Sequence, residues 1–189
     1  MENNGLIEVD NPSELFLSER QNNITGSTIF PSLEGSRPIL VEIQALASNA
    51  NFGTPQRNVN GFDYKRLAML LAVLEKRLGV QIGTKDVFVN LVGGLKVNDP
   101  AADLSVISAV ASSVKDQQIS DSVVLIGEVG LGGEVRSVSG LDTRINESKS
   151  LGFKTIIAPS SNVKRLKDLP KSIEIFGISN VVEAFHKLF

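Results

Sequence analysis

Cysteine and tryptophan are absent from this chain of 189 residues. Without cysteine the chain can form no disulfide and no thiolate-ligated metal centre. Its single histidine, His186, excludes a metal site built from several imidazoles within the chain and argues against a Ser–His or Cys–His catalytic pair. Any chemistry at this chain's own residues therefore has to use hydroxyls, carboxylates and cations.

Long apolar runs and a strong net charge are also missing. No stretch is apolar enough to cross a bilayer, and the first residues lack the basic and apolar regions of a secretory signal. We therefore expect no membrane partner and a cytoplasmic location. The formal net charge is −2, whereas free-standing nucleic-acid binders are usually basic. A nucleic-acid contact would have to come from a local patch.

Nucleotide and metal signatures are missing too. The chain has no GxxxxGK[ST] motif, and "GEVGLGGEV" lacks the GxGxxG spacing and is better explained as a glycine-rich hairpin. The carboxylate pairs Asp99 with Asp103 and Glu128 with Glu134 would give at most a weakly specific Mg²⁺ site. We expect no cofactor in this chain.

Strands and helices alternate over residues 80–189. Residues 26–48 predict an antiparallel hairpin, residues 49–61 a loop, and residues 86–92 a buried strand. The pattern as a whole predicts an α/β (α+β) domain that is compact from about residue 60 and is preceded by a β-rich segment that packs on it. The polar residues 1–25 are expected to form an arm or linker.

The clearest helix spans residues 63–78. Its leucines recur at helical spacing and Gly79 suits the C-terminal cap. On the opposite side, Lys65 and Lys76 are eleven residues apart, about three turns, so they share a face of the helix. Arg66 and Arg77 have the same spacing. We call this predicted face the basic ridge; it consists of Lys65, Arg66, Lys76 and Arg77. The alternative is an ordinary solvated helix face.

The segment "GGLKVNDPAADLSV" has the form of a turn that presents a reactive side chain. A glycine pair, an extended arm and a proline turn precede a helix of small residues. The tip of the turn, however, is Pro100, Ala101 and Ala102, and none of these side chains is a nucleophile.

Several motifs together resemble a known family. They are "VGGLKVNDPAADLSV", "IGEVGLGGEVRSVSGLDTRINESKSLGFKTIIAP" and, upstream, "NGLIEVDNPSELFLSER", "EGSRPILVEIQALAS" and "GFDYKRLAMLLAVLEKRLG". In this order they resemble the C-terminal domain of the bacterial RadA (Sms) DNA repair family, which is similar in turn to the proteolytic domain of Lon. The resemblance implies a Lon protease proteolytic-domain-like (ribosomal protein S5 domain 2-like) fold over residues 26–189. It also implies that residues 1–25 lead from a RecA-like ATPase that is not in this chain.

The resemblance explains the turn without a nucleophile. In Lon proteases the matching turn reads "DGPSAG", and its catalytic serine falls on Ala101. The catalytic lysine of the Lon stretch "GGLREKLLAA" falls on Arg144. Alanine has no hydroxyl, and arginine cannot lose its proton in a protein. The resemblance therefore implies a broken dyad and no peptidase activity; Ser105 is a conceivable substitute but is expected to be a packed helix serine.

Family membership further implies a role in DNA recombination. The complete proteins are expected to be hexameric, DNA-dependent ATPases with ATP, Mg²⁺ and Zn²⁺, which promote branch migration together with the recombinase RecA. In this chain we expect ring assembly and non-specific binding of single- and double-stranded DNA. The candidate DNA contacts are Arg57, Lys65, Arg66, Lys76, Arg77 and Arg144. For Arg144 an internal or intersubunit salt bridge is an equal alternative, and a pure oligomerisation scaffold is the alternative for the whole chain.

Overall fold

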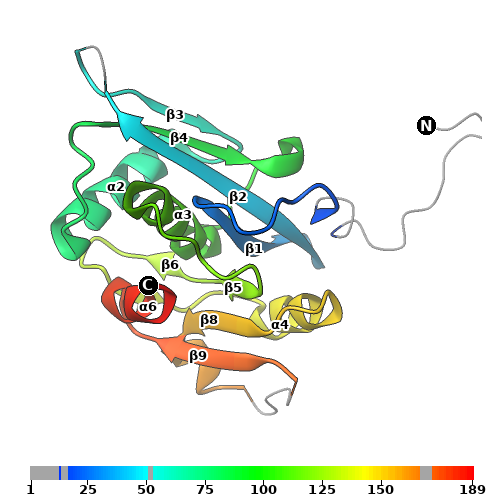
Figure 1. The fold of residues 1–189 in the computed structure, drawn as a ribbon. Helices are drawn as coiled ribbons and strands as arrows, with labels where there is room; N and C mark the ends of the chain where they lie inside the picture. Colours follow the sequence, from blue (N-terminus) through cyan, green and yellow to red (C-terminus); the bar gives the residue numbers. More distant parts are fainter. Residues whose placement is uncertain (1–12, 14–16, 51–52, 167–171) are drawn as a thin grey trace, which may run out of the picture.

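A computed structural model describes residues 13, 17–50, 53–166 and 172–189, and its core is one mixed sheet (Figure 1). Seven strands form this sheet in the order β3-β4-β2-β1-β5-β8-β9, and β6 and β7 form a separate two-stranded ribbon. The strands are β1 (Ser27–Glu34), β2 (Arg37–Asn49), β3 (Arg57–Asn60), β4 (Lys85–Leu91), β5 (Val123–Leu125), β6 (Glu128–Val129), β7 (Val135–Arg136), β8 (Thr155–Pro159) and β9 (Glu174–Ile178).

Among the described residues, helices occupy four of the eight connections between consecutive strands, and a further helix follows the last strand. They are α2 (Tyr64–Leu78), α3 (Asp103–Lys115), α4 (Leu141–Ser150), α5 (Ser160–Val163) and α6 (Val181–Leu188), with 3-10 turns η1 (Val92–Gly94) and η2 (Pro100–Ala102). The predicted α/β class is confirmed, as are the hairpin of β1 with β2 and the alternation after residue 80. In α2, Gly79 adopts the left-handed cap conformation, as predicted. Asp63, expected as the first helical residue, is the N-cap, and its side chain accepts a hydrogen bond from the Arg66 amide.

The β-rich segment is part of the main sheet, which corrects the expectation of a segment packing on a domain that begins near residue 60. Strand β1 pairs antiparallel with β2 and parallel with β5, so it joins the two halves of the sheet. Six consecutive residues of β1, Ser27–Ser32, are buried, so the strand is covered on both faces. The N-terminal hairpin therefore supplies the centre of the core.

Two strands differ from their predictions. Residues 57–60, expected in a loop, form β3, because Arg57 to Asn60 pair in parallel with Val87 to Asn90 of β4. Strand β4 alternates rather than being buried throughout: Val87 and Val89 are buried, whereas Phe88 is 36% exposed. One face of β4 is therefore open, which a continuous apolar run does not reveal.

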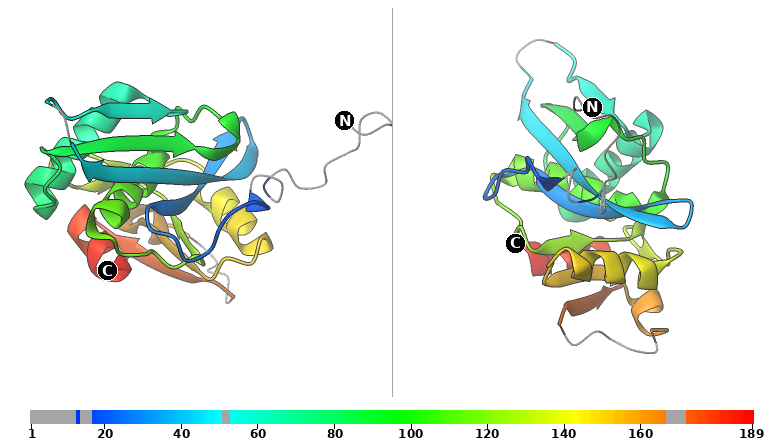
Figure 2. Two further views of the ribbon diagram at one scale, coloured as in Figure 1. Left: turned by 45° about the horizontal axis from the view of Figure 1, so that its top comes forward. Right: turned by 90° about the vertical axis from the view of Figure 1, so that its right-hand side faces the viewer.

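Helices α2 and α3 pack against each other and lie over the strands near β2, and α3 also contacts β1. Helix α3 carries small side chains, and ten of its thirteen residues are buried, which permits the close approach. Helices α4 and α6 lie at opposite ends of the lower part of the molecule in Figure 1 and remain apart in the left view of Figure 2. No helix in the described part of the chain is both long and apolar enough to traverse a bilayer.

The part of the predicted arm that the structure describes contacts the sheet domain. The buried hydroxyl of Ser13 accepts a hydrogen bond from the Leu40 amide (3.0 Å) and donates to Glu147 (2.8 Å). Arg20 forms an ion pair with Asp121 at 3.2 Å. Residues 1–12 and 14–16 of the predicted arm lie outside the described residues.

Candidate functional site

The turn before α3 is held from within. Asp99 precedes the 3-10 turn η2, and its Oδ1 accepts a hydrogen bond from the Ala101 amide at 2.9 Å. The Ala101 carbonyl accepts from the Gly127 amide at 2.8 Å, which ties the turn to the loop after β5. Ala101 itself is 1% exposed, so its methyl group lies in the core at the position where the resemblance places a nucleophile.

Arg144 projects from α4 toward the same turn and is also buried. Its Nη2 donates to Asp99 Oδ2 at 2.5 Å, and its Nε donates to the Ser139 carbonyl at 3.1 Å. Its Nη1 donates to the Pro31 carbonyl of β1, and the guanidinium lies 5.3 Å from the centre of the Phe30 ring. With 1% of its side chain exposed, Arg144 faces the interior and pairs with an acidic neighbour, so its guanidinium is not at the surface where DNA would meet it. The internal salt bridge was the alternative interpretation.

Asp99 therefore connects the two positions of the expected dyad. One carboxylate oxygen binds the backbone at Ala101 and the other binds Arg144. Hydrolysis by a Ser–Lys dyad needs a hydroxyl and a base that can be deprotonated. Neither Ala101 nor Arg144 supplies either group, and the guanidinium of Arg144 is paired with the carboxylate of Asp99.

A second ion pair lies one turn further along. Asp103, the first residue of α3, is fully buried and binds Arg66 of α2 through two contacts of 2.5 Å. Asp103 Oδ2 also accepts a hydrogen bond from the Val129 amide at 2.9 Å. Burial raises the pKa of the Asp103 carboxyl, and the bonds from Arg66 and Val129 act in the opposite direction. The bond to Asp103 in turn raises the pKa of the Arg66 guanidinium.

Ser105, the conceivable substitute nucleophile, is a packed helix serine as expected. It is fully buried, and its hydroxyl lies 2.9 Å from the Leu125 carbonyl and 3.2 Å from the Ile29 carbonyl. Both neighbours accept hydrogen bonds and neither is a base with the strength to activate the hydroxyl.

The structure separates the predicted DNA-contacting cations into two groups. Besides Arg144, Arg66 is committed to Asp103, and Arg57 donates to three carbonyls, those of Gln56, Ile82 and Lys85. Lys65, Lys76 and Arg77 are exposed.

The basic ridge is therefore interrupted. Arg66 turns toward Asp103, and Val73, which lies between the two pairs of cations along α2, is 2% exposed and belongs to the core. A role in DNA binding remains a prediction for Lys65, Lys76 and Arg77.

The candidate carboxylate pairs do not form a metal site. Asp99 and Asp103 each bind an arginine, and Glu134 binds Arg136 at 2.5 Å. Among the described residues, no three His, Asp or Glu side chains lie close enough together to hold a metal ion.

Comparison with known families agrees with this architecture. Residues 78–186 match the Lon protease (S16) C-terminal proteolytic domain, which is more than half of the chain. The chain belongs to this Lon domain family. The expected Lon-like fold is thereby confirmed, and the Lon-like domain contains η2, α3 and α4, the elements that hold Ala101 and Arg144.

Curated relatives of this Lon-like domain include proteins named "DNA repair protein RadA". The identity is 46% with the protein of Halalkalibacterium halodurans and 47% with that of Bacillus subtilis, in each case over 97% of this chain and 40% of the relative. It is 42% with the protein of Streptococcus pneumoniae, over 100% of this chain and 45% of the relative. The predicted resemblance is confirmed, and the chain spans about two fifths of the length of these relatives.

Sequence reasoning missed the acidic partners of the Lon-like site. Asp99 and Asp103 were considered only as a metal-binding pair, although each neutralises an arginine. The spacing of four residues that places both near the start of α3 was visible. Their partners lie 45 and 37 residues away, and no local pattern identifies them.

Proposed function

We propose that this chain is a non-proteolytic Lon-like domain of a RadA-type DNA repair protein, which serves assembly of a ring and non-specific contact with DNA. The observation that carries the proposal is the pair of residues at the dyad positions. Ala101 and Arg144 are buried there and are both hydrogen-bonded to Asp99. A domain that retains the Lon fold without its nucleophile and base retains its shape and surfaces for another use. Similarity to DNA repair proteins over 97–100% of the chain supports that use.

The absence of proteolysis is tested directly by incubating the chain with casein and with a fluorogenic peptide library. We expect no cleavage above buffer, because neither Ala101 nor Arg144 can take part in acyl transfer. Cleavage that disappears in a Ser105→Ala variant would contradict the proposal.

The DNA contact is supported by three exposed cations that form no ion pair with a carboxylate in the described part of the chain, Lys65, Lys76 and Arg77. Each phosphate contact releases counterions, so binding is expected to weaken with salt and to be independent of sequence. The test is fluorescence anisotropy with labelled single- and double-stranded DNA across a salt series. Charge reversal of the three residues is expected to weaken binding; unchanged affinity would favour the scaffold without DNA contact.

Ring assembly is supported by the open face of the sheet. Leu46 is 61% exposed and faces Phe88 across β2 and β4. The two side chains line a hollow of about 400 Å³, together with uncharged side chains that include Gln44, Asn58, Asn60 and Asn90. A surface that combines exposed apolar side chains with uncharged amides suits a contact between protein subunits.

A Leu46→Glu, Phe88→Glu variant tests the assembly proposal by light scattering. We expect the wild-type chain to be oligomeric and the variant to shift toward monomer, because burying two carboxylates at a contact is costly. An oligomer that tolerates both charges would place the contact elsewhere.

The activity of the longer protein belongs to the same proposal. A RecA-like ATPase with ATP and Mg²⁺, a zinc site, the recombinase RecA as partner and branch migration as outcome are proposed for the full-length protein. The Lon-like domain would gather the ATPase units and hold DNA near them.

A further inference from the structure

The C-terminal ends of α2 and α3, together with helix α6, line a cleft of about 460 Å³. Arg77 and Leu78 come from α2, and Lys115 and Gln117 from the end of α3 and the residues after it. Helix α6 and the residue after it supply the third wall, with Val182, Phe185, His186 and Phe189. The volume is in the range of ligand pockets, roughly 300–1,000 Å³.

The cleft is positively charged and its cations are available. Arg77 and Lys115 are exposed, and neither forms an ion pair with any carboxylate of the residues that the structure places. Arg77 makes one long contact, from Nε to the Leu131 carbonyl at 3.4 Å. This distinguishes them from Arg57, Arg66 and Arg144, whose guanidinium groups are bound internally.

No aspartate or glutamate is among the described side chains that line the cleft, although the same elements carry Glu75, Asp116 and Glu183 outside that lining. Glu183 of α6 accepts hydrogen bonds from the Ser179 amide and from Asn180 at the start of its own helix. Asp116, which ends α3, lies 3.4 Å from the Thr25 hydroxyl. The charged side chains that line the cleft are therefore the two cations Arg77 and Lys115.

An aromatic wall accompanies the cations. Phe185 and Phe189 contact each other edge to face, with ring centres 5.4 Å apart. Phe189 is 38% exposed, and the ammonium of Lys115 lies 5.4 Å from the centre of its ring. Cations beside a partly exposed ring suit a phosphate ester that carries a flat aromatic group.

We propose that this cleft binds single-stranded nucleic acid, with backbone phosphates at Arg77 and Lys115 and a base against Phe189. The inference rests on the proposed contact with DNA and assigns it a site that includes Lys115 and Phe189, which sequence reasoning did not single out. A single strand is favoured over a duplex because paired bases are stacked inside the helix and cannot meet a ring at the wall of a cleft.

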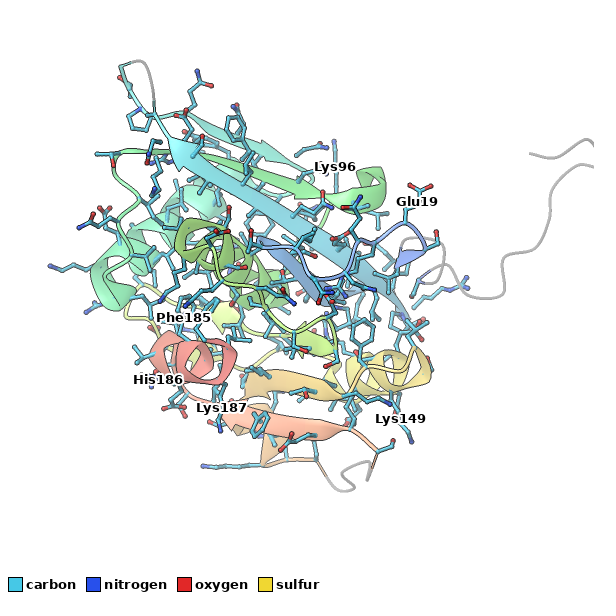
Figure 3. The ribbon with its side chains drawn as sticks, viewed as in Figure 1. Glu19, Lys96, Lys149, Phe185, His186 and Lys187 are labelled. Atoms are coloured by element: carbon cyan, nitrogen blue, oxygen red, sulfur yellow. The ribbon has the colours of Figure 1, made fainter. Side chains whose placement is uncertain are left out.

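His186 offers a specific reporter, because it is the only histidine of the chain and lines the cleft. Figure 3 shows it on α6 beside Phe185 and Lys187. Its imidazole C–H signals can be followed by proton NMR at constant pH and salt during titration with oligothymidylate of twelve residues, with thymidine monophosphate and with inorganic phosphate. We expect the oligonucleotide to move these signals at the lowest concentration, since it combines phosphates and bases.

Variants test the cleft by affinity. Arg77→Gln and Lys115→Gln are each expected to weaken oligothymidylate binding about three- to tenfold and to lower the salt slope by about 0.7. Phe189→Leu is expected to cost about fivefold or more through lost stacking. Lys149→Gln is the matched control, because this exposed lysine lies on α4, at the other end of the molecule from α6 in Figure 3, and is expected to change nothing. Circular dichroism verifies that each variant is folded.

The results distinguish a failure of the cleft as the binding site from a failure of DNA binding by the chain as a whole. If the oligonucleotide binds but His186 and the cleft variants do not respond, the cleft is not the site, while the proposed contact with DNA stands. If no oligonucleotide binds, both fail. If inorganic phosphate or the mononucleotide moves the His186 signals as readily as the oligonucleotide does, the cleft is a small-anion site, and a nucleic-acid site is overturned.

Discussion

At the scale of single residues, Arg144 stands where Lon proteases have their catalytic lysine, and it also holds separate segments of the chain together. Its planar guanidinium donates in three directions, to the side chain of Asp99 and to the carbonyls of Pro31 and Ser139. These partners lie on different segments of the chain, so one side chain joins α4, β1 and the η2 turn. A lysine would offer a single compact ammonium in place of this fork.

Replacing Arg144 with lysine is therefore expected to lower the free energy of unfolding by about 2–4 kcal/mol, because buried acceptors lose their donor. Urea denaturation measures the change. Arg136→Lys is the control: Arg136 pairs with Glu134 on the surface, where the same substitution should cost about 0–1 kcal/mol. Equal losses in the two variants would refute a structural role for the buried arginine.

The Arg66–Asp103 pair gives a prediction that depends on pH. Arg66→Met removes the cation from a fully buried carboxylate, which should lower the free energy of unfolding at pH 7.5 by about 2–4 kcal/mol. Burial then raises the pKa of Asp103 further above its unfolded value. Between the unfolded and the folded pKa of Asp103, the folded variant binds more protons than the unfolded chain. Its stability therefore falls as the pH rises from about 4 toward the folded pKa.

The difference between wild type and the Arg66→Met variant should thus be smaller at pH 5 than at pH 7.5, measured by urea denaturation at both values. Adding Asp103→Asn removes the titrating group and should remove this pH dependence. A difference that is constant with pH would show that Asp103 stays ionised without its partner.

At the scale of elements, the turn between β3 and α2 depends on Gly61. Its backbone has φ +82°, and a Cβ built there would lie 2.4 Å from the Leu95 carbonyl oxygen. The Gly61 carbonyl accepts a hydrogen bond from the Val97 amide at 2.8 Å. This close approach holds the edge strand β3 beside the extended segment that leads to the η2 turn.

Gly61→Ala is expected to cost about 2–4 kcal/mol, the sum of the left-handed backbone penalty and the steric overlap. Gly35→Ala is the matched control, because Gly35 has φ +65° but a Cβ would meet nothing within 4 Å, so only the backbone penalty of about 1–2 kcal/mol applies. Thermal melting of both variants compares the two. Similar shifts would show that the turn moves to accommodate a methyl group.

The sequence predicts elements well where periodicity and caps agree. The leucine stripe, Asp63 and Gly79 define α2, and the turn at residues 34–38 defines the β1–β2 hairpin. The four residues of β3 carry two asparagines and no alternation, and only pairing with β4 makes them a strand. Local propensity cannot report a partner 30 residues away.

The candidate site also has one part that the sequence predicts and another that only the folded structure shows. Resemblance identifies Ala101 and Arg144 as the dyad positions, and residue chemistry then predicts the loss of the reaction. The partner of Arg144 and the fate of Arg66 depend on which side chains meet in the folded core. The exposed cleft cations also follow from tertiary structure, because Arg77 and Lys115 come from different helices.

At the scale of the whole molecule, the described part of residues 1–25 is bound to the sheet domain through Ser13 and Arg20. A chain truncated to residues 26–189 is expected to fold but to lose about 1–3 kcal/mol, because the buried Leu40 amide loses its acceptor and Asp121 its cation. Urea denaturation tests this against a chain of residues 13–189, which retains both contacts. Equal stability of the two would place the domain boundary at residue 25, as predicted.

The bridging position of Asp99 has a consequence for descent. Restoring a serine at Ala101 alone would add a hydroxyl beside a cation that cannot accept its proton, and restoring a lysine at Arg144 alone would cost stability before any gain. Neither Ala101→Ser nor Arg144→Lys alone would therefore be expected to restore proteolysis, and both substitutions would be needed together. On the proposed non-proteolytic function, relatives that keep this Asp99 bridge are expected to vary more at their surfaces than around the bridge.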